Sequence, residues 1–344
     1  MSQTLEISDF IDALQSKPVF DVRSPGEFQQ GHIPGAHNIP LFKNHERAAV
    51  GTLYKQVSRD AALKKGLEYV GPKMREFVEE VEQITESREA LVHCWRGGMR
   101  SNSFAWLLET AGFEVARLKN GYKAYRNFVL DIFSVRCPII ILGGHTGSGK
   151  TEVLQELKKM GEQVIDLEGI ANHKGSAFGH LGENDQPTGE QFQNELGLQW
   201  YLSDSNKPVW VEDESRLVGT RIIPKPFYEQ MRKAPVVHLN IPQEDRIQQL
   251  IKVYSQYDNK KLSQSVQNIQ KRLGGLRTQQ ALQALEEENY HRVVELVLSY
   301  YDDAYDHGLS KRDADSVHRI YTESADPVKN AEQVLEFSHR LSLR

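Results

Sequence analysis

The segment HCWRGGMRS (93–101) places one cysteine among glycines and arginines, between a predicted strand and a predicted helix. Backbone N–H groups at a helix N-terminus favour negative charge, and a thiol placed there has a lowered pKa and reacts as the thiolate. Gly97 and Gly98 let the backbone curl so that several N–H groups converge on one anion. We therefore predict Cys94 as the catalytic residue. The predicted anion loop consists of Arg96, Gly97, Gly98, Arg100 and Ser101.

The second cysteine, Cys137, precedes a proline at a predicted strand entrance and has no neighbouring base, so we interpret it as structural. Two cysteines form neither a disulfide framework nor a four-thiolate zinc site. We therefore expect a reducing, cytoplasmic location and chemistry at a single thiol.

A second motif, GHTGSGKT (144–151), fits the phosphate-loop pattern G-x-x-x-x-G-K-[ST], with an apolar stretch before it and a helical stretch after it. Backbone amides of such a loop surround a phosphate pair, Lys150 neutralises its charge, and Thr151 can hold Mg²⁺. The motif predicts a bound diphosphate and does not require ATP. The predicted diphosphate-binding residues are Gly144, Gly147, Ser148, Gly149, Lys150 and Thr151.

The apolar stretch in PVWVEDESR (208–216) ends in three acids. An acid at this place commonly holds the magnesium shell in phosphate-loop proteins, and the two following residues could contact phosphate. The sequence leaves open which acid binds the metal. The candidates are Glu212, Asp213 and Glu214 for metal, and Ser215 and Arg216 for phosphate.

Three stretches, 43–65, 221–233 and 252–277, combine Lys and Arg with aromatic residues. This combination suits the phosphate backbone and the unstacked bases of RNA. Segment 281–306 carries seven acids against one basic residue, and we expect it to face away from a polyanion. The candidate RNA-binding residues are Lys55, Arg59, Arg221, Lys225, Lys260, Lys261, Lys271 and Arg272.

Alternating strand and helix patterns position these motifs and predict an α/β fold with parallel sheets. Strands are predicted at 18–23, 89–94, 113–121, 139–142, 163–166, 208–212 and 236–241, and helices at 70–84 and 99–112. The predicted division is a domain at 1–130, a linker at 131–138, a phosphate-loop domain at 139–242 and a helical C-terminal region at 243–344.

The 344-residue chain carries 26% charged residues and a formal net charge of -5, which argues against a wholly basic nucleic-acid coat. Its longest strongly apolar stretch, 138–142, is far shorter than the roughly 20 residues needed to cross a bilayer. The N-terminal residues lack the pattern of a signal peptide. We therefore expect no membrane association.

The segment FDVRSPGEFQQGHIPGAHNIP (20–40), together with the Cys94 loop, resembles a rhodanese domain, a sulfur-transfer module whose cysteine carries a persulfide. Asp21, Arg23 and Glu27 match the front motif of that family, where we interpret them as structural. Five residues separate Cys94 from Arg100. Sulfurtransferase loops typically have four residues at this place, whereas those of tyrosine-phosphatase-like and rhodanese-like phosphatases have five. The longer loop should hold a larger or tetrahedral anion.

The fusion of a rhodanese-like module to a phosphate-loop module resembles the bacterial tRNA 2-selenouridine synthases essentially end to end. The stretches VGTLYKQVSRDAAL (50–63) and EDESRLVGTRIIP (212–224) contribute to this resemblance. It implies an N-terminal rhodanese-like α/β domain followed by a P-loop NTPase-like α/β domain with a helical C-terminal region. It also implies a transferase that converts wobble 2-thiouridine in tRNA to 2-selenouridine.

The implied reaction has two steps and two co-substrates. Geranyl diphosphate first alkylates the thiocarbonyl sulfur, and selenium from selenophosphate then replaces the S-geranyl group. The phosphate loop would hold geranyl diphosphate, with Mg²⁺ at Thr151, and the Cys94 loop would accept selenophosphate. Whether Cys94 bonds to selenium or positions the donor stays open from the sequence.

Three alternatives remain at the level of the sequence. One is an ATP-dependent tRNA sulfurtransferase, and another is a rhodanese-like phosphatase fused to a P-loop kinase. A non-enzymatic RNA-binding regulator fits least well, because both motifs are intact.

Overall fold

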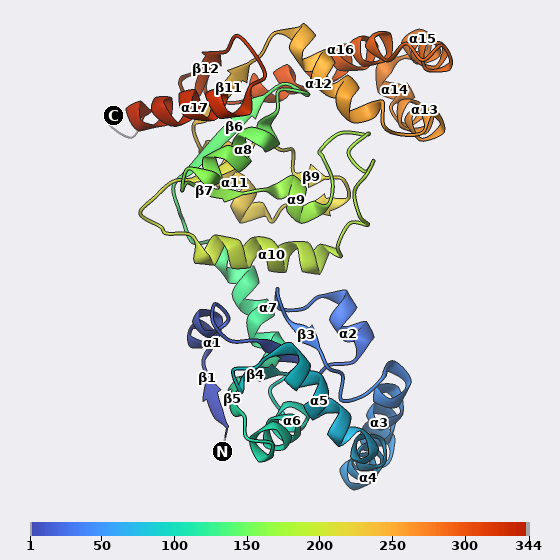
Figure 1. Ribbon diagram of the computed structural model, residues 1–344, viewed down its shortest axis with the longest axis vertical. Helices are drawn as coiled ribbons and strands as arrows, with labels where there is room; N and C mark the ends of the chain where they lie inside the picture. Colours follow the sequence, from blue (N-terminus) through green and yellow to red (C-terminus); the bar gives the residue numbers. More distant parts are fainter. Residues whose placement is uncertain (1, 342–344) are drawn as a thin grey trace. The chain divides into compact units, whose positions relative to one another are not determined.

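The computed structural model describes residues 2–341, which form two compact units (Figure 1). Unit 1 contains the chain up to Ile132 together with Thr188–Leu198. Unit 2 contains Phe133–Pro187 and the chain from Gln199 onward. The helix α10 (Gly189–Leu202) therefore begins in unit 1, although its sequence lies inside the predicted second domain.

Unit 1 is built on a five-stranded parallel sheet with the strand order β1-β5-β4-β2-β3. The strands are β1 (Gln3–Leu5), β2 (Val19–Asp21), β3 (His37–Asn38), β4 (Glu89–His93) and β5 (Glu114–Leu118). The helices are α1 (Ile7–Ala13), α2 (Pro25–Gln30), α3 (Asn44–Gln56), α4 (Arg59–Val70), η1 (Gly71–Lys73), α5 (Met74–Ile84), α6 (Met99–Thr110) and α7 (Gly121–Ile132). The core includes Phe20 and Val92 from the sheet and Phe77 and Phe104 from the helices.

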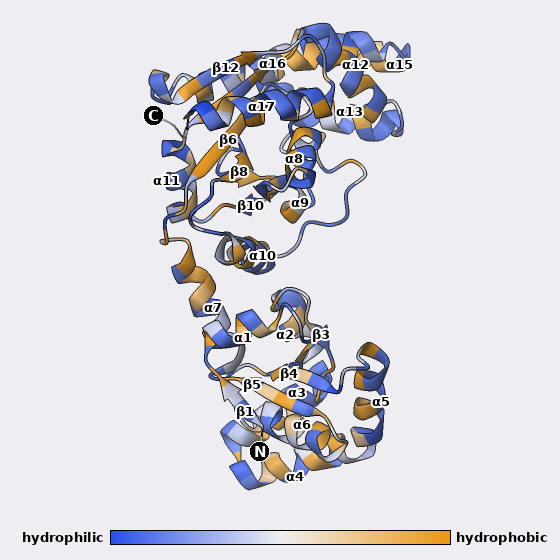
Figure 2. Cartoon of the chain, turned by 60° about the vertical axis from the view of Figure 1, so that its left-hand side comes forward, coloured by the Kyte–Doolittle hydropathy of each residue, from blue (hydrophilic) through white to orange (hydrophobic). Residues whose placement is uncertain are grey.

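Unit 2 has a second five-stranded parallel sheet, with the order β12-β11-β6-β8-β7. Its strands are β6 (Ile139–Gly144), β7 (Gln163–Ile165), β8 (Val209–Glu212), β11 (Val236–Asn240) and β12 (Val317–Tyr321). A short antiparallel pair, β9 (Leu217–Val218) and β10 (Arg221–Ile222), follows β8. Every residue of β6 is buried, and Figure 2 shows this central strand largely in orange. Burial on both faces is typical of parallel strands covered by helices.

The helices of unit 2 divide between the sheet and a separate helical layer. They are α8 (Lys150–Lys159), α9 (Leu167–Ala171), α11 (Lys225–Lys233), α12 (Gln243–Tyr254), α13 (Asn259–Asn268), α14 (Gln270–Leu273), α15 (Gly275–Glu286), α16 (Tyr290–Leu309), η2 (Ala314–Ser316) and α17 (Pro327–Leu341). Helices α13, α15 and α16 share an apolar core of their own that includes Leu262, Leu285 and Val297. Helices α8 and α17 pack on the sheet through Leu154 and Val334.

The predicted α/β fold is confirmed, and each predicted strand is present within a few residues of its expected bounds. The region after 243 is not purely helical, because β12 returns to the sheet beside β11. Its sequence, VHRIY, alternates charged and apolar residues only weakly, as expected for a partly exposed edge strand. Within residues 2–341, no helix has both the length and the apolar character to cross a membrane.

Candidate functional site

The Cys94 loop connects β4 to α6 and is supported from behind by the start of α7. The backbone N–H of Tyr122 donates to the carbonyl oxygen of Cys94 at 2.8 Å, and that of Lys123 donates to Trp95 at 3.0 Å. The Sγ atom of Cys94 lies 3.3 Å from Oγ of Ser101, and Cys94 as a residue is 3% exposed. The loop therefore holds Cys94 at its base, in a fixed place.

The turn before α7 depends on a glycine. Gly121 has a φ of +60°, and a Cβ atom at this position would lie 2.5 Å from the amide nitrogen of Gly97 and closer still to the carbonyl oxygen of Cys94. Any side chain here would push the Cys94 loop out of place.

We therefore expect Gly121→Ala to lower the free energy of unfolding by at least about 1–3 kcal/mol, in addition to distorting the loop. Gly112→Ala is the matched control, because Gly112 has a φ of +89° but no atom within 4 Å of the added Cβ. Urea unfolding of both variants measures the difference. Equal losses of stability would show that backbone strain, and not crowding of the Cys94 loop, sets the effect.

Arg100 joins the loop to the front motif of the domain. Its Nη1 donates to Oε2 of Glu27 at 2.9 Å, and Glu27 also caps α2 through the backbone N–H of Ser24. Burial alone would raise the pKa of Glu27, but its hydrogen bond to Arg100 and the positive charge of that residue hold the pKa below its usual value. Arg100 is thus fixed beside the loop as a permanent positive charge.

A surface cavity of about 500 Å³ lies in front of this arrangement. Its wall contains Arg47 and Arg100, both paired with Glu27, together with Glu190 and the partly exposed aromatic face of Trp95. The exposed face of Trp95 could stack on an unpaired base, and the arginines could contact a phosphate group. Trp95 was not predicted, although it directly follows the catalytic candidate, whereas Arg47 belongs to the predicted basic stretch 43–65.

Asp21 and Arg23 form a buried ion pair beneath the loop. Nη2 of Arg23 lies 2.6 Å from Asp21 and donates to the carbonyl oxygen of Gly31 at 2.7 Å. The guanidinium also lies 3.7 Å from the ring centre of Tyr122. These contacts fit the structural role that we assigned to Asp21 and Arg23.

His93 precedes the catalytic candidate and is completely buried, with an oxygen of Asp21 3.7 Å from its Nε2. Burial lowers the pKa of His93 to about 4, although the negative charge of Asp21 opposes this shift. In the range from pH 6.5 down to 4, the unfolded chain therefore binds a proton that the folded chain does not bind.

Stability should consequently be fully present above pH 6.5 and fall as the pH is lowered toward 4. The expected contribution of His93 to this loss is roughly 3 kcal/mol. Urea unfolding at pH 7 and pH 4.5 should show a smaller loss for His93→Gln than for the unchanged protein. His37→Gln, at an exposed position, is the control. A His93→Gln variant with the same pH dependence as this control would contradict the assignment.

The start of α10 belongs to this site, which the sequence did not reveal. The buried Asn194 donates to Oη of Tyr122 at 2.7 Å and to the carbonyl oxygen of His32 at 2.9 Å. Oη of Tyr122 donates to Glu190 at 2.7 Å, and Glu190 lines the 500 Å³ cavity. No local signal connects these residues to Cys94, because they follow it by about a hundred positions.

The phosphate loop follows β6 and leads into α8, as predicted. Gly147 and Gly149 have φ values of +83° and +70°, which permit the tight curl of the loop. Nζ of Lys150 donates to the carbonyl oxygen of Gly144 at 2.9 Å and so lies across the loop. The buried hydroxyl of Ser148 has no hydrogen-bond partner. Such an unpaired group inside the loop suits a bound anion.

One buried carboxylate, Glu212, and two half-buried ones, Glu168 and Glu214, lie beside the loop. Oγ1 of Thr151 donates to Glu168 at 3.2 Å, and the backbone N–H of Glu168 donates to Glu212 at 2.7 Å. Burial, together with the neighbouring negative charges, raises the pKa of Glu212 and Glu214 well above the usual value. Burial also raises the pKa of Glu168, although the charge of Lys150 opposes this shift. Added positive charge would therefore favour ionisation of this cluster.

The three acids predicted after β8 have different environments. Asp213 forms an ion pair with Arg312 at 2.6 Å and accepts a hydrogen bond from Oη of Tyr305 at 3.0 Å. Glu212 and Glu214 instead adjoin Glu168. Ser215 and Arg216 are exposed, and Oγ of Ser215 donates to the carbonyl oxygen of Leu217 within the same turn. Glu168 was missed, although it lies just after the predicted strand 163–166.

Within residues 2–341, no group of three His, Cys, Asp or Glu side chains is arranged to hold a metal ion. Magnesium in phosphate sites usually takes one or two protein oxygens, with phosphates and waters completing its shell. Thr151 and Glu168 provide such a pair, and Oε2 of the nearby Glu212 has no partner. These residues fit Mg²⁺ when it is bound together with a phosphate ligand.

The candidate RNA-binding residues are distributed over both units. Lys55 and Arg59 are exposed at the junction of α3 and α4 in unit 1. In unit 2, Arg221 is half-buried and Lys225 is exposed. The remaining four are exposed on the adjoining helices α13 and α14, namely Lys260, Lys261, Lys271 and Arg272.

The expectation that segment 281–306 faces away from a bound polyanion stays a prediction, and the final turns of this segment lie beside the phosphate loop. Asp302 forms an ion pair with Arg246 at 2.7 Å, and Asp306 lies 3.1 Å from His145 of the phosphate loop. Helix α16 runs back to this loop, and Arg246 offsets the negative charge of Asp302. Cys137, which we interpreted as structural, is half-buried, and burial raises its pKa.

Comparison with known proteins agrees with both motifs. A rhodanese-like domain family matches residues 6–128, and a family described as the tRNA 2-selenouridine synthase AAA domain matches residues 137–334. The tRNA 2-selenouridine synthase of Shewanella denitrificans is 33% identical, covering 90% of this chain and 93% of its own length. Those of Hydrogenovibrio crunogenus and Pseudomonas syringae pv. tomato are 35% and 37% identical, covering 87% and 85% of this chain and 91% and 88% of their own lengths. This chain therefore belongs to the tRNA 2-selenouridine synthase family.

Proposed function

We propose that this protein converts 2-thiouridine at the wobble position of tRNA to 2-selenouridine, using geranyl diphosphate and then selenophosphate. The relatives that match most of the chain are named tRNA 2-selenouridine synthases. The observation that carries the two-step proposal is the presence of two separate anion sites in one chain. One is the phosphate loop with the adjacent carboxylates of Glu168 and Glu212, and the other is the loop from Cys94 to Arg100.

In the first step, the sulfur of 2-thiouridine attacks C1 of geranyl diphosphate. The S–C1 bond forms while the C1–O bond breaks, diphosphate leaves with the electron pair, and the base releases its N3 proton to solvent. Lys150 and the loop amides stabilise the negative charge that develops on diphosphate. Mg²⁺ held by Thr151 and Glu168 would neutralise further charge on the same group.

In the second step, the selenium of selenophosphate attacks C2 of the geranylated base. The C2–S bond breaks and geranyl thiol leaves, after which water cleaves the P–Se bond and releases phosphate. Arg100 and the amides of the Cys94 loop hold the phosphate group of the donor. Alkylation of sulfur in the first step makes it a better leaving group in the second.

Cys94 positions the selenium donor in this proposal. If its Sγ displaced phosphorus from selenium, phosphorus would leave as phosphite, and release of phosphate would require a separate two-electron oxidant. Attack by selenium on the base needs no oxidant. We therefore propose that Cys94 contacts the selenium donor and holds it in place at the base of the loop, where the thiol lies beside Ser101.

The first step provides the test of this proposal. The full-length protein is incubated with tRNA that carries 2-thiouridine and with geranyl diphosphate, and the nucleosides are analysed by mass spectrometry. We expect an S-geranyl adduct without added ATP. If sulfur transfer coupled to ATP hydrolysis occurred instead, the protein would be an ATP-dependent sulfurtransferase. Vanadate-sensitive cleavage of an aryl phosphate without an adduct would favour the phosphatase alternative.

A further inference from the structure

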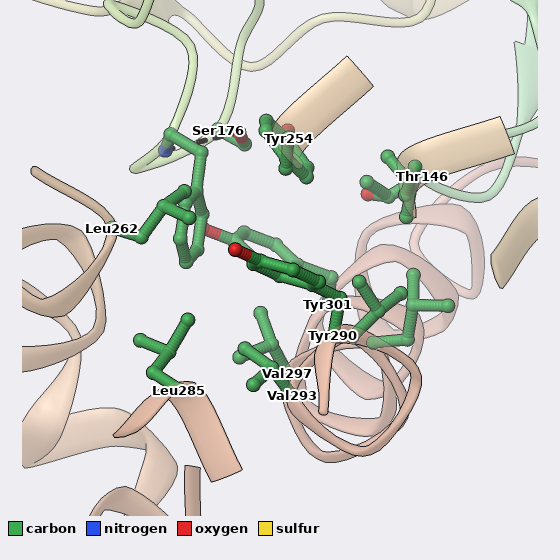
Figure 3. Close-up of a pocket in the computed structure, with 13 residues that line it drawn as sticks. Thr146, Ser176, Tyr254, Leu262, Leu285, Tyr290, Val293, Val297 and Tyr301 are labelled. Carbon is green, nitrogen blue, oxygen red and sulfur yellow. Dashed lines mark hydrogen bonds between the residues drawn. The ribbon is translucent and has the colours of Figure 1, made fainter. Parts of the chain in front are cut away.

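An apolar cavity adjoins the phosphate loop in unit 2 (Figure 3). Its walls come from α12, α13, α15 and α16 and from the segment that follows α9. Thr146 of the phosphate loop lies on one side of the cavity, and Leu285 lies on the opposite side. The cavity thus extends from the proposed diphosphate site into the helical layer.

The side of the cavity nearest the loop is fixed by charged and apolar contacts. Nη1 of Arg246 donates to the carbonyl oxygen of Thr146 at 3.1 Å, and the same guanidinium is paired with Asp302 of α16. A Cβ atom on Gly147 would lie 3.0 Å from Leu250, which also lines the cavity. The phosphate loop and the cavity wall are therefore in direct contact.

Three of the hydroxyl groups around the cavity already have partners. Oη of Tyr290 donates to Asn259 at 3.1 Å, and Oη of Tyr301 accepts the backbone N–H of Ala177 at 2.9 Å. Oγ of Ser176 accepts the backbone N–H of Phe178 at 3.2 Å. Because the remaining lining is mainly leucine, valine and aromatic side chains, the cavity favours an apolar ligand.

The shape of the cavity favours a thin chain over a ring system. The empty space between the lining residues, including the open mouth, is about 460 Å³. Only about 30 Å³ of this space is wide enough to admit the centre of a water molecule, so the cavity is narrow. From Leu298 to Tyr290, both at the wall, α16 spans roughly 12 Å at its usual rise per residue. This length is comparable with that of an extended ten-carbon prenyl chain, whereas the narrow space does not suit a purine base.

We propose that this cavity holds the hydrocarbon chain of an allylic diphosphate whose diphosphate lies in the loop Gly144–Thr151. The inference rests on the proposed function and adds the site that selects the length of the chain. Leu285 and Val293, which share the apolar core of the helical layer, limit how far the chain extends. The reacting carbon stays near Lys150, at the opposite end from Leu285.

Substitutions at Leu285 test this assignment. Leu285→Phe should shorten the cavity and reduce kcat/KM for geranyl diphosphate roughly tenfold relative to that for the five-carbon dimethylallyl diphosphate. Leu285→Ala should lengthen it and raise use of the fifteen-carbon farnesyl diphosphate relative to geranyl diphosphate. Leu282→Phe is the matched control, because Leu282 lies on the same helix and packs on the same core but does not line the cavity.

The readout is the amount of each S-prenyl nucleoside formed on 2-thiouridine tRNA, measured by mass spectrometry with the full-length protein. Binding of inorganic diphosphate by each variant verifies that the phosphate loop is intact. If the unchanged protein transferred no prenyl chain, the proposed function and this inference would both be wrong. If it transferred the geranyl group but both Leu285 variants kept the chain-length preference of Leu282→Phe, only the inference would be overturned.

Discussion

Replacing Lys150 with Met is expected to abolish S-geranylation of tRNA. Nζ of Lys150 lies across the phosphate loop, 2.9 Å from the carbonyl oxygen of Gly144, where it can neutralise departing diphosphate. Loss of one such charged donor should reduce the rate by about 10²–10³-fold, or more in a site with buried carboxylates. Nucleoside mass spectrometry after incubation with geranyl diphosphate measures the loss.

Two comparisons make the Lys150→Met result specific. Lys158→Met changes an exposed lysine of the same helix and should leave geranylation unchanged. The Lys150→Met protein should still convert tRNA that was geranylated beforehand into selenouridine tRNA when selenophosphate is supplied. Geranylation by Lys150→Met at the rate of the unchanged protein would refute the role of the phosphate loop.

Replacing Cys94 with Ala should impair selenium incorporation and spare geranylation, which is the reverse of the pattern expected for Lys150→Met. We expect selenium incorporation to fall by about 10²-fold, since the donor loses its contact at the base of the loop. S-geranylation should continue, because Lys150 and the phosphate loop belong to a separate anion site. The geranylated nucleoside should therefore accumulate in the presence of selenophosphate, which mass spectrometry detects directly.

Cys137→Ala is the control for the thiol, because burial raises the pKa of Cys137 and the loop residues do not include it. This variant should incorporate selenium at the normal rate. Cys94→Ser, which keeps a polar atom near Ser101, should retain more activity than Cys94→Ala if Cys94 acts by positioning. Normal selenium incorporation by Cys94→Ala would contradict any role of this thiol.

The sequence predicted the parts of the fold that depend on local pattern. The strands that carry both loops have buried apolar stretches, Ala90–Val92 in β4 and Ile139–Leu142 in β6, as is typical of parallel strands covered by helices. The glycines and the lysine of the phosphate loop are required at fixed spacings by its backbone, so they were visible without a structure. The edge strand β12 has no such pattern and was missed.

The residues that complete each site come from distant parts of the chain, and local pattern does not reveal them. Asn194 and Glu190 form hydrogen bonds with Tyr122, which supports the Cys94 loop, although they follow Cys94 by about a hundred positions. Glu168 follows β7 and Thr151 follows β6, and they meet because both strands are parallel neighbours of β8 with their carboxyl ends at one edge. The ion pair of Asp302 with Arg246, which brings α16 to the phosphate loop, was likewise not visible in the sequence.

The most direct test of the two-site proposal uses tRNA that carries 2-thiouridine, the full-length protein and geranyl diphosphate, with and without selenophosphate. Mass spectrometry of the nucleosides should show S-geranyl-2-thiouridine when selenophosphate is absent and 2-selenouridine when it is present. Formation of 2-selenouridine without geranyl diphosphate would contradict the proposed first step. Unchanged 2-thiouridine under both conditions would contradict the proposed function as a whole.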